Sequence, residues 1–384
     1  MYQELRGKVA VVGADESDQI GEVPNKSTLH LQAEAIRNAL NDAGLNLTDV
    51  DGLFTAGTPV AVLAEYLGIM PRYFDGTSVG GCSYLVHVEH AVLALYHGLC
   101  DVAVISHGES GRSRVGAFRP IMGEATPVGQ FEAPFGTYGP TTLFPIPILR
   151  YMKEYGRTRE EFAEVAVNTR KWATLNPRAM MRDPITVDDV LNSRLICYPL
   201  TLFMCCLVTD AAGALVLVRG DKAKEIRKDP VYILGTGEGL EHQQVAQMRD
   251  FTASRAFKLA GNRAFEMSGL KHEDIDFLEL YDAFVHTPIY ALEALGFAKQ
   301  GEALDMILSG RMAPGGDLPL NTNGGGLSYT HSGMYGMFAL VEAIRQLRGE
   351  RGDGQVPNAN IGLVHGVGGM FSASGTVIFS NQRS

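Results

Sequence analysis

The segment AEAIRNALNDAGLNLTDVDGLF at residues 33–54 returns in altered form as GNRAFEMSGLKHEDIDFLEL at residues 261–280. Six pairs of residues are identical or similar at one constant offset of 225 positions. The pairs are Gly44 with Gly269, Leu45 with Leu270, Asp49 with Asp274, Val50 with Ile275, Asp51 with Asp276 and Leu53 with Leu278. Both segments predict an amphipathic helix, a glycine at its end, a short acidic linker and a buried strand. The constant offset favours an internal duplication.

A second parallel follows in the same order along the chain. Residues 78–110 read SVGGCSYLVHVEHAVLALYHGLCDVAVISHGES, and residues 321–350 read NTNGGGLSYTHSGMYGMFALVEAIRQLRGE, followed by ANIGLVHGVGG at 359–369. Each stretch predicts a small-residue loop, a long apolar helix and a strand. Chance similarity between helix–strand units is the alternative, but the repeated order favours duplication. Strands that alternate with helices predict an α/β fold with mixed sheets covered by helices.

The boundary between the halves is predicted near the charged run RGDKAKEIRK at residues 219–228, which follows the apolar strand GALVLV. We therefore divide the chain into an N-terminal half, residues 1–220, and a C-terminal half, residues 221–384. An insertion at about residues 115–200 has no counterpart in the second half. Such insertions usually supply a substrate cap or binding loops, although they can also be surface padding.

The composition narrows the class of protein. The chain has 384 residues, 46% of them hydrophobic and 20% charged, and a net charge of −10 without a run of Lys or Arg. Nucleic acid and anionic membranes are therefore not expected as main partners. Neither a signal peptide nor a membrane span is predicted. Five cysteines without CxxC spacing argue against a disulfide framework and a metal site, so we expect a cytoplasmic protein.

Cys82 lies in VGGCSYLVHVEHA, after two glycines and at the predicted start of a long apolar helix. The N-terminus of a helix stabilises a thiolate, which is the nucleophilic form of cysteine. The glycines allow a substrate carbonyl to approach the backbone closely. Cys82 is therefore a candidate nucleophile, and a small buried cysteine that fills space is the alternative.

Three polar residues lie where strands or turns present side chains to a ligand. Tyr329 and His331 belong to the glycine-rich turn NTNGGGLSYTHSGMYG, and both can donate to a developing thioester enolate. Tyr281 lies in FLELYDAF, at the end of an apolar strand, where α/β proteins tend to place ligand contacts. For all three, a hydrogen-bonded structural role is the alternative.

His365 lies in IGLVHGVGGMF, a predicted strand followed by a glycine-rich turn. This turn is a poor candidate for a phosphate-binding loop, because neither GxxxxGK[ST] nor GxGxxG spacing is present. GESGRS also does not match the GxSxG signature of a serine hydrolase. Cys205 and Cys206 are predicted to be core residues associated with a strand.

At four segments, GGCSY, YDAF, THSGMYG and VHGVGG, the sequence resembles the thiolase superfamily over nearly its whole length. It is most similar to the SCP-x thiolase-like branch, also called lipid-transfer proteins, and there to the acyl-CoA retro-aldolases of steroid side-chain degradation. The resemblance implies two βαβαβαββ halves in a five-layered αβαβα fold. It also implies a coenzyme A thioester as substrate, with no bound cofactor and no metal.

Two departures from the thiolase motifs bear on the reaction. Tyr281 stands where thiolases of the HDCF type have a histidine, and Ser332 replaces the proline of the GHP motif. Tyrosine has an ordinary pKa near 10, so it is a weak base at neutral pH unless its surroundings change that value. The aldolase branch generally lacks the thiolase cysteine, whereas Cys82 is present here. A shift of one residue in the alignment puts Gly81 at the position of the nucleophile.

Three functions remain open. In the favoured one, retro-aldol cleavage of a β-hydroxyacyl-CoA, Tyr281 or Tyr329 removes the hydroxyl proton and His331 stabilises the enolate. In the second, thiolytic cleavage or Claisen condensation, Cys82 is acylated, His365 activates it and His331 stabilises the enolate. In the third, the chain is a catalytically silent scaffold or lipid carrier.

The resemblance also implies partners. Members of the superfamily are normally homodimers, and the aldolase branch often needs a small OB-fold, zinc-ribbon partner of the DUF35 type. The predicted contacts with the substrate and its CoA group are four glycines of the two glycine-rich turns and two arginines. They are Gly325, Gly326, Gly368, Gly369, Arg112 and Arg114.

Overall fold

The structure is a computed structural model, and it describes residues 2–117, 126–137 and 139–383. Nine strands form one mixed sheet in the order β3-β2-β4-β7-β1-β8-β11-β10-β9. The strands are β1 Val9–Glu16, β2 Gly52–Thr55, β3 Tyr73–Asp75, β4 Val102–Ser110, β7 Asp210–Arg219, β8 Val231–Leu240, β9 Phe277–Leu280, β10 Ile361–Gly368 and β11 Ala373–Ser380. Strands β1 and β8 are paired at only two positions, so the sheet consists of two halves joined by a short seam.

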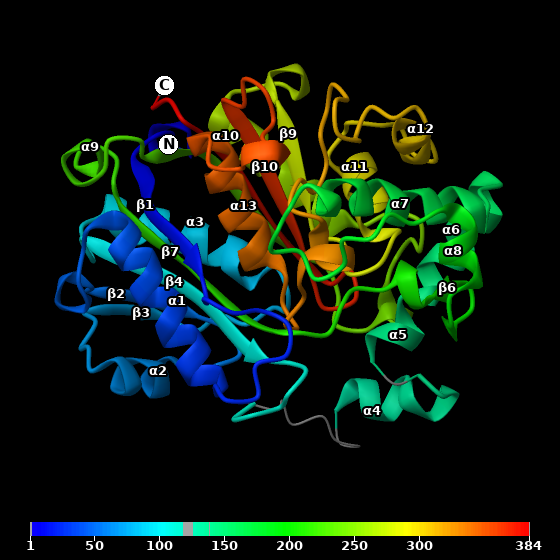
Figure 1. The fold of residues 1–384 in the computed structure, drawn as a ribbon, viewed down its shortest axis with the longest axis horizontal. Coiled ribbons are helices and arrows are strands. Elements are labelled where there is room, and N and C mark those ends of the chain that lie inside the picture. The colour runs from blue at the N-terminus through cyan, green and yellow to red at the C-terminus, as the bar shows by residue number, and fades with distance from the viewer. Residues whose placement is uncertain (1, 118–125, 138, 384) are drawn as a thin grey trace.

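The helices form three layers around the two halves of the sheet (Figure 1). Helix α1, Thr28–Ala43, covers strands of the first half, and α10, Arg255–Ser268, covers strands of the second half. Helices α3, Ser83–Tyr96, and α13, Gly336–Arg348, lie between the halves and contact strands of both. The strands are almost continuously buried because helices cover both of their faces. This is the expected five-layered order.

The two related segments at the start of each half have the same local structure. Gly44 and Gly269 end helices α1 and α10 in the left-handed conformation, with φ of 69° and 66°. Strands β2 and β9 then begin at the same offset of 225 residues. The predicted helix, glycine cap and buried strand are thus confirmed in both halves.

The second half departs from the expected βαβαβαββ pattern at one place. The first half has a third strand, β3, that pairs with β2 in parallel. At the corresponding place beside β9, the second half has only a single parallel bridge between Leu278 and Leu320. The division of the chain near residue 220 remains our proposal. The change of covering helix from α1 to α10 between β7 and β8 supports it.

The described part of the insertion folds into helices and a two-stranded hairpin, and residues 118–125 and 138 lie outside the described residues. Its elements are α4 Pro127–Phe131, α5 Pro140–Leu143, α6 Pro145–Tyr155, α7 Arg159–Thr174, α8 Val187–Asn192, β5 Leu195–Cys197 and β6 Leu200–Thr201. Figure 1 shows α6 and α7 beside α11, Thr287–Ala294, and α12, Ala303–Leu308, of the second half. The insertion therefore lies against the half of the chain that contains Tyr281 and His331.

The remaining elements are short. They are α2 Val60–Leu67, α9 Ala223–Ile226, a π-helical turn Gly325–Tyr329, and 3₁₀ turns at Tyr2–Leu5, Leu47–Asp49, Ala133–Phe135, Leu202–Met204, Val245–Gln247, His272–Asp274 and Gly352–Gly354. Among the described helices, none combines the length and apolar character needed to cross a bilayer. Within the described ranges, no three His, Cys, Asp or Glu side chains are grouped so that they could hold a metal ion.

Candidate active site

Tyr281 and His331 form a buried hydrogen-bonded pair. Tyr281 follows the last residue of β9, and its backbone N–H donates to the carbonyl of His365 on the neighbouring strand β10 at 2.9 Å. The Tyr281 hydroxyl lies 2.8 Å from Nε2 of His331. The two residues are 5% and 9% exposed. The end of β9 and the turn before α13 thus bring together two residues that the sequence separates by 50 positions.

The hydrogen bonds of His331 define which of its ring nitrogens carries the proton. The backbone N–H of Gly333 donates to Nδ1 of His331 at 3.3 Å, so Nδ1 presents a lone pair. Burial lowers the pKa of His331 to about 4, so its ring is neutral at physiological pH. The proton of the neutral ring therefore lies on Nε2, and this N–H donates to the hydroxyl oxygen of Tyr281.

Two opposing effects act on the Tyr281 hydroxyl. Burial raises its pKa well above the ordinary value, and the backbone N–H of Tyr335 opposes this rise. The His331 Nε2–H is a second donor to the same oxygen. N–H groups that converge on one oxygen stabilise a negative charge there. The arrangement thus suits an oxygen that accepts and returns a proton during a reaction.

Gly81 lies against the ring of Tyr281. A Cβ atom added to Gly81 would be only 2.1 Å from Cε1 of Tyr281, which is far shorter than a van der Waals contact. The Tyr281 ring therefore fills the space that a side chain at position 81 would need. Of the two residues that the sequence left open for the nucleophile position, Gly81 is the one that faces Tyr281.

Cys82 caps the N-terminus of α3, as the sequence predicted, but its side chain packs in the interior. It is 0% exposed and forms a small apolar cluster with Val79, Val86 and Ala373. Burial raises the pKa of the Cys82 thiol to about 12. The thiol is therefore protonated at physiological pH, and it is not in the nucleophilic form.

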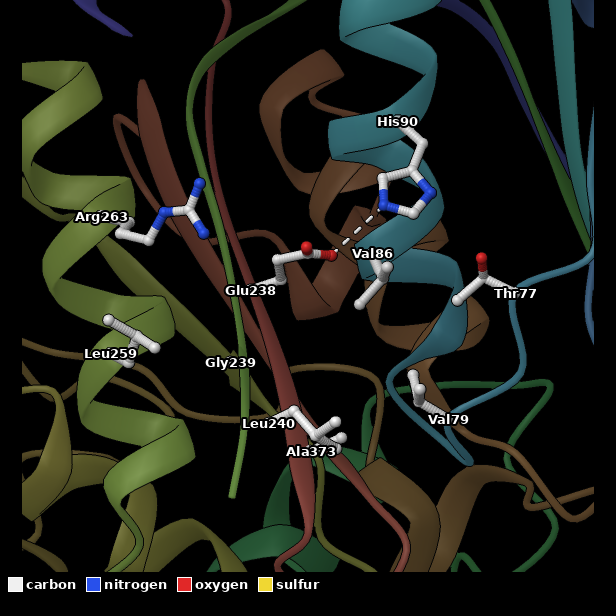
Figure 2. Close-up of a pocket in the computed structure, with 10 residues that line it drawn as sticks. All are labelled: Thr77, Val79, Val86, His90, Glu238, Gly239, Leu240, Leu259, Arg263 and Ala373. Atoms are coloured by element: carbon white, nitrogen blue, oxygen red, sulfur yellow. Dashed lines mark ion pairs between the residues drawn. The ribbon is translucent and has the colours of Figure 1, made fainter. Parts of the chain in front are cut away.

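A surface cavity of about 330 Å³ borders this cysteine cluster, and Figure 2 shows the residues around it. Val79, Val86 and Ala373 line both the cavity and the cluster. On its wall, Nε2 of His90 pairs with Glu238 at 3.3 Å. The hydrogen bonds of Asp75 and Glu238 raise the pKa of His90 to about 10. None of the predicted site residues lines this cavity, so it does not supply the reacting groups.

His365 lies on the other face of β10 from Cys82. Its ring contacts Thr376 through Nδ1 at 2.8 Å and packs edge-on against Phe257 of α10 at 4.6 Å between centroids. The next residue, Gly366, faces Cys82. Because successive side chains of a strand point to opposite faces, His365 cannot contact the thiol. The predicted activation of Cys82 by His365 is wrong for this reason.

Comparisons with known proteins bear on the family. A model of the family described as thiolase C-terminal domain-like matches residues 237–381. The chain is 36% identical to 17-hydroxy-3-oxo-4-pregnene-20-carboxyl-CoA lyase of Mycobacterium tuberculosis, over 90% of this chain and 92% of the relative. This chain belongs to the thiolase superfamily.

Further members of the superfamily agree with this assignment. Acetyl-CoA acetyltransferase of Methanothermobacter thermautotrophicus is 32% identical over 97% of this chain and 99% of the relative. The solved structure of an Ltp2-ChsH2(DUF35) aldolase has a TM-score of 0.89 and 32% identity, and covers 98% of this chain and 99% of its own. The predicted superfamily and fold are confirmed, and so is the prediction of an enzyme of this superfamily.

Tyr329, the last residue of the π-helical turn, bonds to Glu16 and has no hydrogen bond to Tyr281 or His331 among the described side-chain contacts. Its hydroxyl donates to Glu16 at the end of β1, where Arg345 and Arg178 also lie. Burial raises the pKa of Glu16, but the two arginines outweigh this effect and hold it below its ordinary value. Burial raises the pKa of Tyr329, and Glu16 adds to the rise. This geometry indicates a structural ion cluster rather than a base.

We therefore predict that Tyr329→Phe affects stability more than catalysis. The free energy of unfolding should fall by about 1–3 kcal/mol, because the buried Glu16 carboxylate loses a hydrogen bond. Thermal unfolding and kcat, measured on the same preparation, check this prediction. If kcat instead falls as strongly as in a Tyr281 variant and stability is unchanged, Tyr329 takes part in the reaction.

The four predicted glycines approach other backbone segments closely. Gly325 and Gly326 surround the carboxylate of Asp282, which accepts the Gly326 N–H at 2.6 Å. Burial raises the pKa of Asp282 to about 7. Gly368 and Gly369 lie against residues 79–82, because a Cβ on Gly368 would be 2.0 Å from the carbonyl of Val79. Gly325 and Gly326 thus pack around Asp282, and Gly368 and Gly369 pack against the loop before α3; binding of substrate by these glycines remains a proposal.

The two predicted arginines have different surroundings. Arg112 lines an open cavity of about 520 Å³ together with Arg170, Arg194 and apolar side chains. Arg114 is exposed and lies near Glu109. The wall of the cavity includes residues 205–209. The backbone of this segment bonds to Ala283, Gly326 and His331. One wall of the cavity therefore adjoins the turn that holds His331, but neither Tyr281 nor His331 lines the cavity.

Several residues of the site lie outside the predicted set. Asp282, Thr209, Arg170 and Arg194 belong to the walls just described. Asp282 could have been found because it directly follows Tyr281 in the YDAF segment. Thr209, Arg170 and Arg194 come from the insertion and the segment after it, and no sequence motif marks their position.

Proposed function

We propose that this chain cleaves a carbon–carbon bond of a β-hydroxyacyl-CoA by a retro-aldol reaction. The observation that carries the proposal is the buried Tyr281 hydroxyl, which receives the Nε2–H of His331 and lies over Gly81. The lyase and aldolase among the relatives support the same reaction class. Release of a ketone from such a thioester, followed by mass spectrometry, tests the proposal, and a folded protein that releases none would overturn it.

The Tyr281–His331 pair accounts for the proton transfers of the reaction. The phenolate of Tyr281 takes the proton of the β-hydroxyl group, the Cα–Cβ bond breaks, and its electron pair passes to the thioester as an enolate. The β-carbon leaves as a ketone or aldehyde. Tyr281 then returns the proton to the α-carbon, which gives the shortened acyl-CoA. The His331 Nε2–H stabilises negative charge on the Tyr281 oxygen before and after the transfer.

For the substrate, we propose a CoA thioester with a bulky apolar acyl group. The M. tuberculosis relative is named as a lyase of a hydroxylated pregnene-carboxyl-CoA, which is a steroid thioester. The cavity of about 520 Å³ offers both kinds of surface that such a substrate needs. Its arginines suit the phosphates of CoA, and Leu202, Phe203 and Leu327 provide apolar walls. We propose no bound cofactor in addition to the CoA thioester.

The acyl-transfer alternative depends on Cys82, and its burial supports the lyase instead. We predict that Cys82→Ala retains kcat for lyase turnover within about twofold, because the substitution removes a core sulfur without an unpaired polar group. Mass spectrometry of the wild-type protein after incubation with acetyl-CoA should show no acyl adduct. An adduct that disappears in Cys82→Ala would support thiolase chemistry.

A DUF35-type protein is proposed as a partner. The similar solved aldolase is named with a DUF35 component, and it matches this chain along almost its whole length. Co-expression with such a protein, followed by size-exclusion chromatography, tests this proposal. Co-elution with increased lyase activity supports it, and separate elution of the two folded proteins contradicts it.

We also propose a homodimer, and we retain the predicted cytoplasmic location as a proposal. Strand β3 is at the end of the sheet and pairs only with β2 among the described strands. Met70 and Phe74, before and within this strand, are 95% and 66% exposed. An unpaired strand edge next to large apolar side chains is a surface that proteins usually cover. Analytical ultracentrifugation decides between a dimer and a monomer.

A further inference from the structure

A second hydrogen-bonded chain of side chains lies directly behind His331. The Tyr84 hydroxyl of α3 is 2.6 Å from Nδ1 of His107 on β4. Nε2 of His107 is 2.9 Å from the hydroxyl of Ser332, the residue after His331. All three side chains are buried. None of them takes part in the reaction described above, so their contacts call for another role.

We propose that Tyr84, His107 and Ser332 form a positioning relay that holds His331 in place to donate to Tyr281. The relay rests on the proposed function, since it assigns supporting residues to the same reaction. It acts on His331 through the turn of residues 331–333 and does not contact the substrate in this assignment.

The turn is held at three consecutive residues. The backbone of His331 bonds to Thr209 in both directions, at 2.9 and 3.1 Å. Ser332 is held by His107 from the side of β4. Gly333 has a φ of +104°, and the carboxylate of Glu109 fills the space of its missing side chain, 2.1 Å from an added Cβ. Of these three contacts, only the one at Ser332 is made by a side chain of the turn, through its hydroxyl group.

The hydrogen bonds of the relay all run in one direction because His107 is neutral. Burial lowers the pKa of His107 to about 3, and the nearby His331 adds to the effect. A neutral ring has one N–H and one lone pair, so the hydroxyl protons of Tyr84 and Ser332 must point in the same sense along the chain. The Tyr84 hydroxyl also lies 3.1 Å from the carbonyl of Ala56, which can accept its proton instead. In that arrangement the Ser332 hydroxyl donates to Nε2 of His107, and this hydrogen bond holds the turn in place.

The relay also connects two segments that contact Tyr281. Tyr84 is three residues after Gly81 on the same helix start, and Gly81 lies against the ring. Ser332 follows His331, whose Nε2 lies 2.8 Å from the Tyr281 hydroxyl. A proline at position 332, as in the GHP motif of thiolases, has no hydroxyl and could not bond to His107. The serine is therefore what makes this connection possible.

Ser332→Ala tests the relay, because it removes one hydroxyl with little change of volume. We expect kcat about tenfold lower at nearly unchanged KM, as for the loss of one buried hydrogen bond that positions a reacting group. Ser110→Ala is the matched control, since Ser110 is a buried serine on β4 that bonds to Val115 and Thr28 outside the relay. His107→Gln combined with Ser332→Ala should be no worse than the more damaging single variant.

Ring ¹⁵N shifts of the histidines give a readout that does not depend on turnover. Ser332→Ala should shift the ring nitrogens of both His107 and His331, and Ser110→Ala should shift neither. A chain without lyase activity would overturn the proposed function, while these shifts would still test the relay. Unchanged His331 ring signals in folded Ser332→Ala, or an unchanged kcat in an active enzyme, would overturn it.

Discussion

Tyr281→Phe should lower kcat for ketone release by about 10²–10⁴-fold, the usual contribution of a general acid–base group. The substitution removes only the hydroxyl oxygen that lies 2.8 Å from Nε2 of His331, and the ring that fills the space above Gly81 remains. The protein should therefore fold and bind the acyl-CoA with similar affinity. Steady-state kinetics of ketone release, together with a thermal unfolding curve, measure both effects.

The pH dependence of the wild-type enzyme gives a second test of the same residue. Burial raises the pKa of Tyr281 well above its ordinary value, so the reactive phenolate is a minor species at neutral pH. We expect kcat/KM to increase with pH through the neutral and alkaline range, by up to about tenfold per pH unit below this pKa. Tyr290→Phe, a buried tyrosine bonded to the carbonyl of Phe251, is the control for hydroxyl loss. A flat profile, or equal activity in Tyr281→Phe, contradicts the role of Tyr281.

Gly81→Ala should lower kcat by about 10²-fold, although it adds only one methyl group. The added Cβ would lie 2.1 Å from the Tyr281 ring, so the ring has to move by about an ångström or more. A displacement of this size at a reacting group typically costs two orders of magnitude in rate. Kinetics measure the effect, and a structure of the variant should show the Tyr281 hydroxyl shifted away from His331.

Gly76→Ala is the matched control for this substitution. Gly76 lies in the same loop before α3, and its added Cβ would be 3.1 Å from a methyl group of Val60, which can shift. This control should keep kcat close to that of the wild type. Equal effects at positions 76 and 81 would indicate that the loop as a whole, rather than contact with Tyr281, determines the activity.

Much of the fold could be predicted from local signals that repeat. A glycine in the left-handed conformation ends each of the related helices, and a short buried strand follows it, so Gly44 and Gly269 mark equivalent points. The missing third strand of the second half could not be predicted. It depends on whether the chain around Leu320 pairs with β9 over several residues or only at Leu278, and that is decided by tertiary packing.

The site was predictable in part, because motif order brought out Tyr281 and His331. The choice between Gly81 and Cys82 could not be predicted. Consecutive residues at the start of a helix point about 100° apart around the helix axis, so a shift of one residue in the alignment changes which residue faces the site. The predicted role of His365 was wrong for a similar reason, because the alternation of side chains along β10 turns its ring towards α10. The residues of the insertion, such as Arg170 and Arg194, come from segments whose position depends on packing against the second half.

The dependence on free coenzyme A tests the central claim most directly. The protein is incubated with 17-hydroxy-3-oxo-4-pregnene-20-carboxyl-CoA, the thioester named for the M. tuberculosis relative, with and without added free CoA, and the products are quantified by mass spectrometry. Retro-aldol cleavage predicts equimolar ketone and shortened acyl-CoA without any free CoA, at a rate that free CoA does not increase. No ketone from this thioester, or ketone only when free CoA is consumed, would contradict the account.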